Sequence, residues 1–158
     1  MKNEKRIRDL CELGTQRLME GRVSEAIDLY EQSIHIQPTA EGYTFRGWAV
    51  SFLGDLDSAI EDCKRAIRID PDFGNPYNDI GVYLMQKGRF DDAIPWFETA
   101  KNAKRYQPRH FPYLNLGRIY LAKGQAMRAL DEFVKALEIH PADDSALDAI
   151  KKIKYSVN

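Results

Sequence analysis

Cysteine is scarce in this chain of 158 residues, which contains only Cys11 and Cys63. Two cysteines so far apart do not make the framework of a disulfide-stabilised fold. The sequence also lacks any Asn-x-Ser/Thr glycosylation site and any run of 18 apolar residues that would span a membrane. Its opening, MKNEKRIRDL, has no apolar stretch of the kind found in a signal peptide. These absences predict a protein of the reducing cytoplasm without membrane association.

The chain also has few histidines and a net charge close to zero. We find no cysteine or carboxylate at a typical ligand spacing around His35, His110 and His140, so no metal site is expected. The 23 basic and 24 acidic residues leave a formal net charge of −1. The chain as a whole therefore carries no signal for binding polyanions.

Catalytic motifs are missing as well. The sequence has neither a Walker phosphate-binding loop nor a Gly-x-Ser-x-Gly nucleophile turn. Asp72-Phe73-Gly74 matches a kinase metal-binding tripeptide, but no glycine-rich loop or His-Arg-Asp accompanies it, so we interpret it as a turn. The paired carboxylates Asp91-Asp92 and Asp143-Asp144 each open a predicted helix, where the helix dipole favours negative charge. We therefore expect neither an enzyme nor a cofactor.

Glycine, in contrast, is regularly spaced. Eight of the ten glycines form two series, offset by seven residues and with steps of 33, 34 and 36 residues: Gly14, Gly47, Gly81, Gly117 and Gly21, Gly54, Gly88, Gly124. Alanine follows the same steps at Ala26, Ala59, Ala93 and Ala129, and proline recurs at Pro38, Pro71 and Pro141. A period of this length indicates a stack of similar structural units.

Each unit is predicted to be two antiparallel helices joined by a tight turn. In the first unit, apolar residues recur at helical spacing through 7–20, Gly21 interrupts the helix, and a second helix runs to Pro38. The same pattern divides a single domain, 1–158, into units of residues 7–39, 40–73, 74–109 and 110–143. Residues 144–155 follow as a capping helix, with Leu147 and Ile150 expected to point inward.

The small and large residues of this pattern have complementary predicted roles in packing. Glycines of the first series and the repeated alanines should let the two helices of a unit approach closely. Glycines of the second series should end the first helix in a left-handed conformation. Large side chains should fill the remaining space, at Leu10, Tyr43, Tyr77 and Tyr113 in the first helices and at Tyr30, Phe97 and Phe133 in the second.

These positions resemble the tetratricopeptide repeat, a 34-residue unit. Its pattern has a large residue at position 4, small residues at positions 8, 20 and 27, an aromatic residue at position 24 and proline at position 32. The resemblance covers residues 7–143 and implies an all-α solenoid, a right-handed superhelix of antiparallel helix pairs. In the second unit, Arg46 replaces the usual leucine at position 7 and Cys63 replaces the aromatic residue at position 24. In the third, Arg105 holds the proline position and Pro108 follows later, which predicts either a longer second helix or a wider loop.

The resemblance also implies a concave groove lined by the first helix of each unit, and this groove is the predicted site for a partner protein. Trp48 and Phe52 share one helical face there, and buried aromatic side chains dominate interface energies. We therefore expect the groove to bind a peptide or helix of an unidentified partner, unless several of these side chains pack under neighbouring helices instead. The predicted binding residues are Arg8, Thr15, Met19, Glu41, Thr44, Trp48, Phe52, Asn75, Asn78, Val82, Met85, Phe111, Leu114, Asn115 and Arg118.

One mode of recognition known in the family is disfavoured here. Some members bind the C-terminal carboxylate of a chaperone with a clamp of lysine, asparagine and arginine side chains. In this chain Cys11 and Thr15 hold the places of the first lysine and asparagine, and Asn115 is an isolated match. We therefore do not expect binding of a chaperone tail.

A basic stretch suggests two alternative functions. Residues 99–130 contain no Asp or Glu but seven basic residues: Lys101, Lys104, Arg105, Arg109, Arg118, Lys123 and Arg128. The first four are a candidate basic patch for an acidic partner or for nucleic acid, with Tyr106 and Phe111 available for stacking. Nucleic acid is disfavoured, because charge runs on helices are usually solvated faces. Self-association is the other alternative, and the expected state is a monomer or a weak homodimer.

Overall fold

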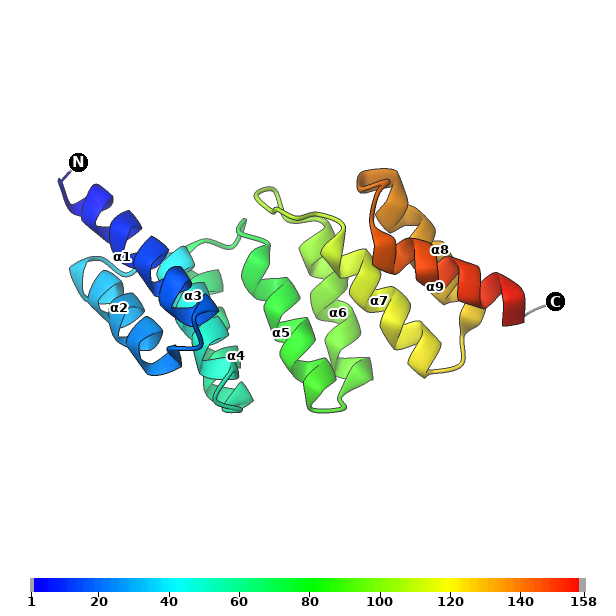
Figure 1. Ribbon diagram of the computed structural model, residues 1–158, viewed down its shortest axis with the longest axis horizontal. Helices are drawn as coiled ribbons and strands as arrows, with labels where there is room; N and C mark the ends of the chain where they lie inside the picture. The colour runs from blue at the N-terminus through cyan, green and yellow to red at the C-terminus, as the bar shows by residue number, and fades with distance from the viewer. Residues whose placement is uncertain (1, 157–158) are drawn as a thin grey trace.

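The computed structural model describes residues 2–156 and contains, within them, nine α-helices (Figure 1). They are α1 (Lys2–Met19), α2 (Val23–Ile36), α3 (Ala40–Ser51), α4 (Leu56–Ile69), α5 (Asn75–Gln86), α6 (Phe90–Lys101), α7 (Phe111–Ala122), α8 (Ala126–Ile139) and α9 (Asp144–Ser156). The helices form an elongated row with the N-terminus at one end and the C-terminus at the other (Figure 1). The predicted all-α solenoid is therefore confirmed. No helix of the described part is both long enough and apolar enough to cross a membrane.

Contacts between the helices are local along the row. Each odd-numbered helix from α1 to α7 packs against the helix that follows it, and successive pairs meet through α2–α3, α4–α5 and α6–α7. The ninth helix packs on α8. In addition, α1, α3, α5 and α7 contact one another in order, so the first helices of the pairs form one continuous face. This face carries the candidate site.

In three of the four helix pairs, the glycine inside the first helix lies against an aromatic ring of the second helix. A Cβ atom on Gly81 would lie 2.6 Å from the ring of Phe97, and one on Gly117 would lie 2.7 Å from the ring of Phe133. Both phenylalanines are almost completely buried. Glycine and ring thus occupy one packing site, which explains why both recur with the same period.

The second glycine series ends the first helices, as the sequence predicts. Its four members have φ between 72° and 80°, which is the left-handed region that residues with a side chain rarely adopt. They are Gly21, Gly54, Gly88 and Gly124. The chain can therefore reverse direction within three or four residues.

The second helix pair is packed differently, because Cys63 stands where the other pairs have a ring. A Cβ atom on Gly47 would lie 3.0 Å from the backbone oxygen of Ala59, so the backbones of α3 and α4 approach each other directly. Arg46 crosses from α3 to α4, and its Nε and Nη2 donate to the carboxylate of Asp62 at 2.8 and 2.7 Å. Asp62 is only 4% exposed, so this pair of charges is part of the core.

Residues 102–110 form a wide loop between α6 and α7, and the alternative of a longer helix is wrong. Arg105 of this loop donates to the carboxylates of Glu41 at 2.8 Å and Asp70 at 2.5 Å. Its guanidinium also lies 4.3 Å from the ring centroid of Phe73. Arg105, which holds the usual proline position of the repeat, therefore connects the loop to the second helix pair.

The ninth helix closes the C-terminal end of the row. Its Ala146 and Ile153 are buried and Ile150 packs against the same cluster. Leu147 is 46% exposed, so the expectation that it points inward is wrong. Positions 146, 150 and 153 share one helical face, whereas position 147 is turned by about 100° from position 146. The exposed face of α9, with Lys151 and Lys154, meets water.

Candidate protein-binding groove

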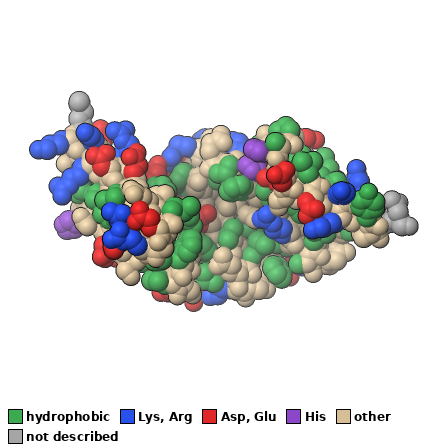
Figure 2. Space-filling model, viewed as in Figure 1, with side chains coloured by type: hydrophobic (Ala, Val, Ile, Leu, Met, Phe, Trp, Pro, Cys, Tyr) green, Lys and Arg blue, Asp and Glu red, His purple; other side chains and the backbone are tan. Residues whose placement is uncertain are grey.

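The face formed by α3, α5 and α7 is hollowed by a groove of about 520 Å³. In Figure 2 the centre of this face shows mainly apolar and uncharged side chains, and the charged ones lie mostly toward the ends of the row. Equivalent positions of three successive units meet here because each first helix presents the same side to the groove. The lining residues are Trp48, Ser51, Phe52, Asn78, Asp79, Val82, Tyr83, Gln86, Phe111, Leu114, Asn115 and Arg118.

Aromatic side chains form the apolar part of the groove. Trp48 packs against the buried cluster that contains Leu18 and Tyr30. It meets Phe52 edge-on, with ring centroids 5.9 Å apart. Phe52 is 59% exposed, and Phe111 on the opposite side of the groove is 43% exposed. Such partly exposed rings beside a cavity are typical of surfaces that bind another molecule.

A row of hydrogen-bonded polar side chains crosses the groove from α5 to α9. The Nδ2 atom of Asn115 donates to Oδ1 of Asn78 at 3.1 Å. Arg118 donates from Nη1 to Oδ1 of Asn115 at 2.9 Å and from Nη2 to the hydroxyl of Ser145 at 3.1 Å. Asn78 and Asn115 are both buried, so these bonds fix how their amide groups are oriented. We call these residues, Asn78, Asn115, Arg118 and Ser145, the polar row.

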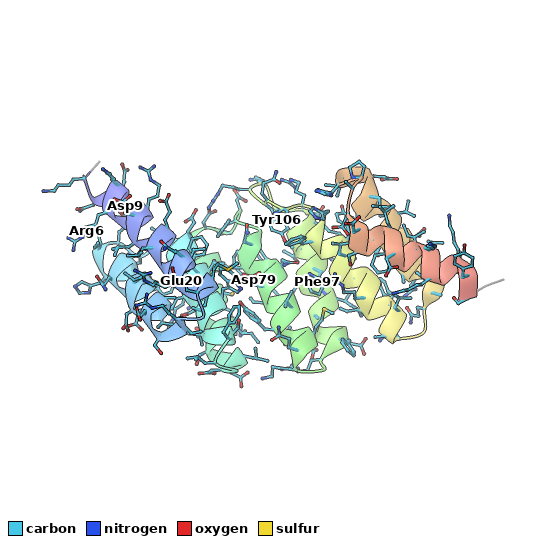
Figure 3. All side chains as sticks on the ribbon, in the orientation of Figure 1. Arg6, Asp9, Glu20, Asp79, Phe97 and Tyr106 are labelled. Carbon is cyan, nitrogen blue, oxygen red and sulfur yellow. The ribbon has the colours of Figure 1, made fainter. Side chains whose placement is uncertain are left out.

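The carboxyl group of Asp79 lies at the α5 end of the polar row, in the middle of the molecule (Figure 3). Loss of water around this group raises its pKa to about 7, and a hydrogen bond from Asn78 acts in the opposite direction. Burial is the main cause that raises the pKa of Tyr83 and Tyr106, and the charge of Asp79 raises both further. A carboxyl group with a strongly raised pKa in a groove is a candidate functional group.

Replacing Asp79 by asparagine should stabilise the protein at alkaline pH. The pKa of Asp79 in the folded state, about 7, exceeds its ordinary value of 3.8. Between these two values the unfolded state is ionised while the folded state keeps its proton, so stability falls from about pH 4 to pH 7 and stays constant above that. Near pH 4 the effect is almost absent. We expect the free energy of unfolding of Asp79→Asn to exceed that of the wild type by about 1–3 kcal/mol at pH 8.

Urea denaturation at pH 4, 6 and 8 measures this difference. Asp131→Asn, which removes an exposed carboxylate of α8, serves as the matched control and should behave as the wild type at each pH. A difference between Asp79→Asn and the wild type that stays constant from pH 4 to pH 8 would contradict the assignment.

Eight of the predicted binding residues line the groove, and the other seven do not. Arg8 and Thr15 line a separate, smaller cavity of about 360 Å³ beside α1. Thr44 is buried and donates to a backbone oxygen of its own helix. Met85 packs against the buried cluster around Ile80 and Phe97. Met19 is 74% exposed and lies outside both cavities.

The last two of these seven make contacts with the loop between α6 and α7. Glu41 accepts a hydrogen bond from Arg105, and Asn75 donates to the backbone oxygen of Gln107 at 3.1 Å. Conversely, sequence reasoning missed Asp79 and Tyr83 as groove residues. Asp79 and Asn115 both hold position 6 of their repeat units. The repeat position that identified Asn115 could therefore have identified Asp79 as well.

Most of the candidate basic patch is paired with carboxylates. Lys101 lies 2.9 Å from Glu132, and both side chains are at most 10% exposed. Lys104 pairs with Asp72, and Arg105 pairs with carboxylates of the second helix pair. The prediction that Tyr106 is available for stacking is wrong, because this side chain is only 4% exposed. These cations therefore join neighbouring parts of the chain.

Arg109, the fourth member of the patch, donates to backbone oxygens of its own loop, those of Ala103 and Lys104. The stretch that appeared basic in the sequence is thus balanced by acidic residues from other units. Its charges act mainly within the fold.

The structure brings together two histidines that are far apart in the sequence. The rings of His110 and His140 are stacked with centroids 4.6 Å apart, and Asp143 lies beside them. The statement that no carboxylate has a ligand spacing is wrong, because Asp143 follows His140 by three residues across the turn between α8 and α9. Within the described residues, these three side chains form a group whose donor atoms are close enough to hold a metal ion.

Models of one protein family match most of the chain. A tetratricopeptide repeat model matches residues 40–73, and a second model of the same description matches residues 75–106 and 112–143. The small glutamine-rich tetratricopeptide repeat-containing protein 2 of Mycosarcoma maydis is 38% identical over 74 residues, which are 46% of this chain and 21% of that protein. The chain thus spans about a fifth of the length of this relative.

Solved structures share the arrangement of helices. The structure of pilF from Pseudomonas aeruginosa superposes with a TM-score of 0.91 at 19% identity, covering 99% of this chain and 71% of that one. YrrB, described as a TPR protein with an unusual peptide-binding site, superposes with a TM-score of 0.70 at 22% identity, covering 87% and 71%. At these identities the likeness shows a common fold.

Proposed function

This chain belongs to the tetratricopeptide repeat family, and on that basis we propose that it is a non-catalytic adaptor that binds a segment of another protein. Proteins of this family generally mediate protein–protein interactions. The proposed site is the groove of α3, α5 and α7, and the proposed ligand is an extended or helical peptide segment. The observation that carries the proposal is that the exposed rings of Phe52 and Phe111 line the same groove as the polar row.

Two kinds of contact support peptide binding. The rings of Trp48, Phe52 and Phe111 offer apolar surface that side chains of a partner would remove from water. Asn78 and Asn115 offer amide groups, which match the donors and acceptors of a peptide backbone. Because a mutual hydrogen bond already orients these amides, less conformational entropy is lost on binding. YrrB, which shares this fold, is described as having an unusual peptide-binding site, and this supports the proposal.

The polar groups of Asp79 and Arg118 favour one orientation of the segment. Asp79 lies at the centre of the groove on α5, and the exposed guanidinium of Arg118 lies on α7. Arg118 uses part of its donors on Asn115 and Ser145, which leaves further N–H groups for an acidic ligand. A segment that places a basic group beside Asp79 and an acidic group beside Arg118 fits these charges best.

Replacing Phe52 or Phe111 by alanine should weaken peptide binding by about 10- to 100-fold, because each substitution removes an aromatic anchor. Both side chains are roughly half exposed, so the fold should survive. Peptides are first selected on the wild type from a random peptide library, and the affinity of a labelled peptide is then measured by fluorescence polarisation. Met127→Ala, which removes a 67% exposed side chain of α8 outside the groove, is the control and should bind as the wild type.

Equal affinity of the selected peptides for the wild type, Phe52→Ala and Phe111→Ala would exclude the groove as the site. Sedimentation equilibrium separates peptide binding from the alternative in which a second copy of the chain fills the groove, since only the latter gives a dimer. Nucleic acid is less well supported than either, because most cations of the basic stretch have carboxylate partners.

A further inference from the structure

Two segments meet at the surface near the C-terminal end of the row. His110 precedes α7, whereas His140 and Asp143 belong to the turn between α8 and α9. Nε2 of His110 and Oδ2 of Asp143 are 3.5 Å apart, and one donor atom from each of the three side chains lies within 4.8 Å of the others. Figure 2 shows histidine and acidic side chains adjoining on this face.

The chemistry of the three groups suits a transition-metal ion. Imidazole nitrogen and carboxylate oxygen are the ligands that Zn²⁺ accepts besides thiolate. His110 is 7% exposed, so the surrounding residues hold its ring in place. His140 is exposed and free to adjust its side chain.

Asp143 is held in a fixed orientation. Its Oδ1 accepts a hydrogen bond at 2.8 Å from the backbone N–H of Ala146, in the first turn of α9. This bond leaves Oδ2 directed toward His110. A carboxylate that is anchored through one oxygen and offers the other is the arrangement found in metal sites with an oriented ligand shell.

We propose that His110, His140 and Asp143 form a binding site for a divalent transition-metal ion, with Zn²⁺ as the best match. Zn²⁺ takes nitrogen ligands at about 2.0–2.1 Å, so donors at present within 4.8 Å of one another need a small movement, which the exposed His140 can supply. Three protein ligands leave the fourth position to water or to a group from outside. This inference is independent of the proposed peptide binding.

A bound ion would connect the start of α7 to the turn that precedes α9. The ring of His110 meets the ring of Phe111 edge-on, with centroids 4.8 Å apart. The site therefore adjoins an aromatic residue of the groove, and occupation by a metal would restrict both the capping helix and this end of the groove.

Titration of the metal-free chain with ZnCl₂ in a calorimeter tests the proposal. We expect one ion per chain with a dissociation constant of about 10 µM or tighter, and a higher melting temperature in the presence of Zn²⁺. His140→Ala and Asp143→Asn should each weaken binding at least about tenfold. His140 is exposed, and asparagine keeps the oxygen that accepts from Ala146, so both variants should fold. His35→Ala, which removes the one histidine outside the proposed site, is the matched control and should bind as the wild type.

Titration with Co²⁺ adds a spectroscopic readout, because visible absorption of a tetrahedral Co²⁺ complex should appear in the wild type and be lost in His140→Ala. The proposal is overturned if Zn²⁺ does not bind saturably below about 100 µM. It is equally overturned if His35→Ala weakens binding as much as His140→Ala, since binding would then be a property of exposed histidines in general.

Discussion

Replacing Arg46 by leucine is expected to lower the free energy of unfolding by about 3–5 kcal/mol, although leucine is usual at this position of the repeat. Arg46 donates two hydrogen bonds to Asp62, which is only 4% exposed. Leucine would leave that carboxylate buried without its main partner. Arg65, at 3.4 Å from Asp62 and more exposed, would compensate in part, so the lower end of the range is the firmer expectation. Urea denaturation followed by circular dichroism measures the loss.

The double variant Arg46→Leu/Asp62→Leu should recover most of this loss, because two apolar side chains can replace a buried ion pair with little change in stability. Arg68→Leu, which removes an exposed ion pair with Glu61, is the control and should change stability by less than about 1 kcal/mol. A double variant as unstable as Arg46→Leu would show that the volume of the side chains, and not the unpaired charge, determines the cost.

The example of Arg46 shows what the sequence predicts and what it leaves open. A leucine-type position occupied by arginine is visible in the sequence, but its partner lies 16 residues away on the facing helix. The periodic features were predicted well, since glycine and ring recur together and each repeat packs mainly on its neighbours. The loop after α6 could not be decided from the local sequence, because the contacts of Arg105 with Glu41 and Asp70 hold it in place.

The candidate groove was predicted only in part for a related reason. Repeat positions identify which helical face is presented, and this sufficed for Trp48 and Asn78. They do not tell which side chains of that face turn under a neighbour, as Met85 does. Nor do they give the surroundings of Asp79, whose raised pKa depends on how several helices exclude water from its carboxyl group. Such properties arise from packing across repeats.

Replacing Phe97 by alanine should lower the free energy of unfolding by about 3–5 kcal/mol, the range for removing a buried aromatic ring. Phe97 of α6 is fully buried in the core cluster around Ile80 and Leu116 and lies over Gly81 of α5. The space opposite the ring is a helix backbone without a side chain, so the cavity has few neighbours able to move into it. Urea denaturation, followed by circular dichroism and tryptophan fluorescence, measures the loss.

The central position of Phe97 adds a second expectation. In a stack where each pair contacts only its neighbours, weakening the third pair weakens the link between the first two pairs and the fourth. Tyr155→Ala, which removes a 74% exposed ring of α9, should stay within about 0.5 kcal/mol of the wild type. A loss below about 1 kcal/mol in Phe97→Ala would mean that the helices close over the cavity. Contact between glycine and ring would then not be the reason that both recur with one period.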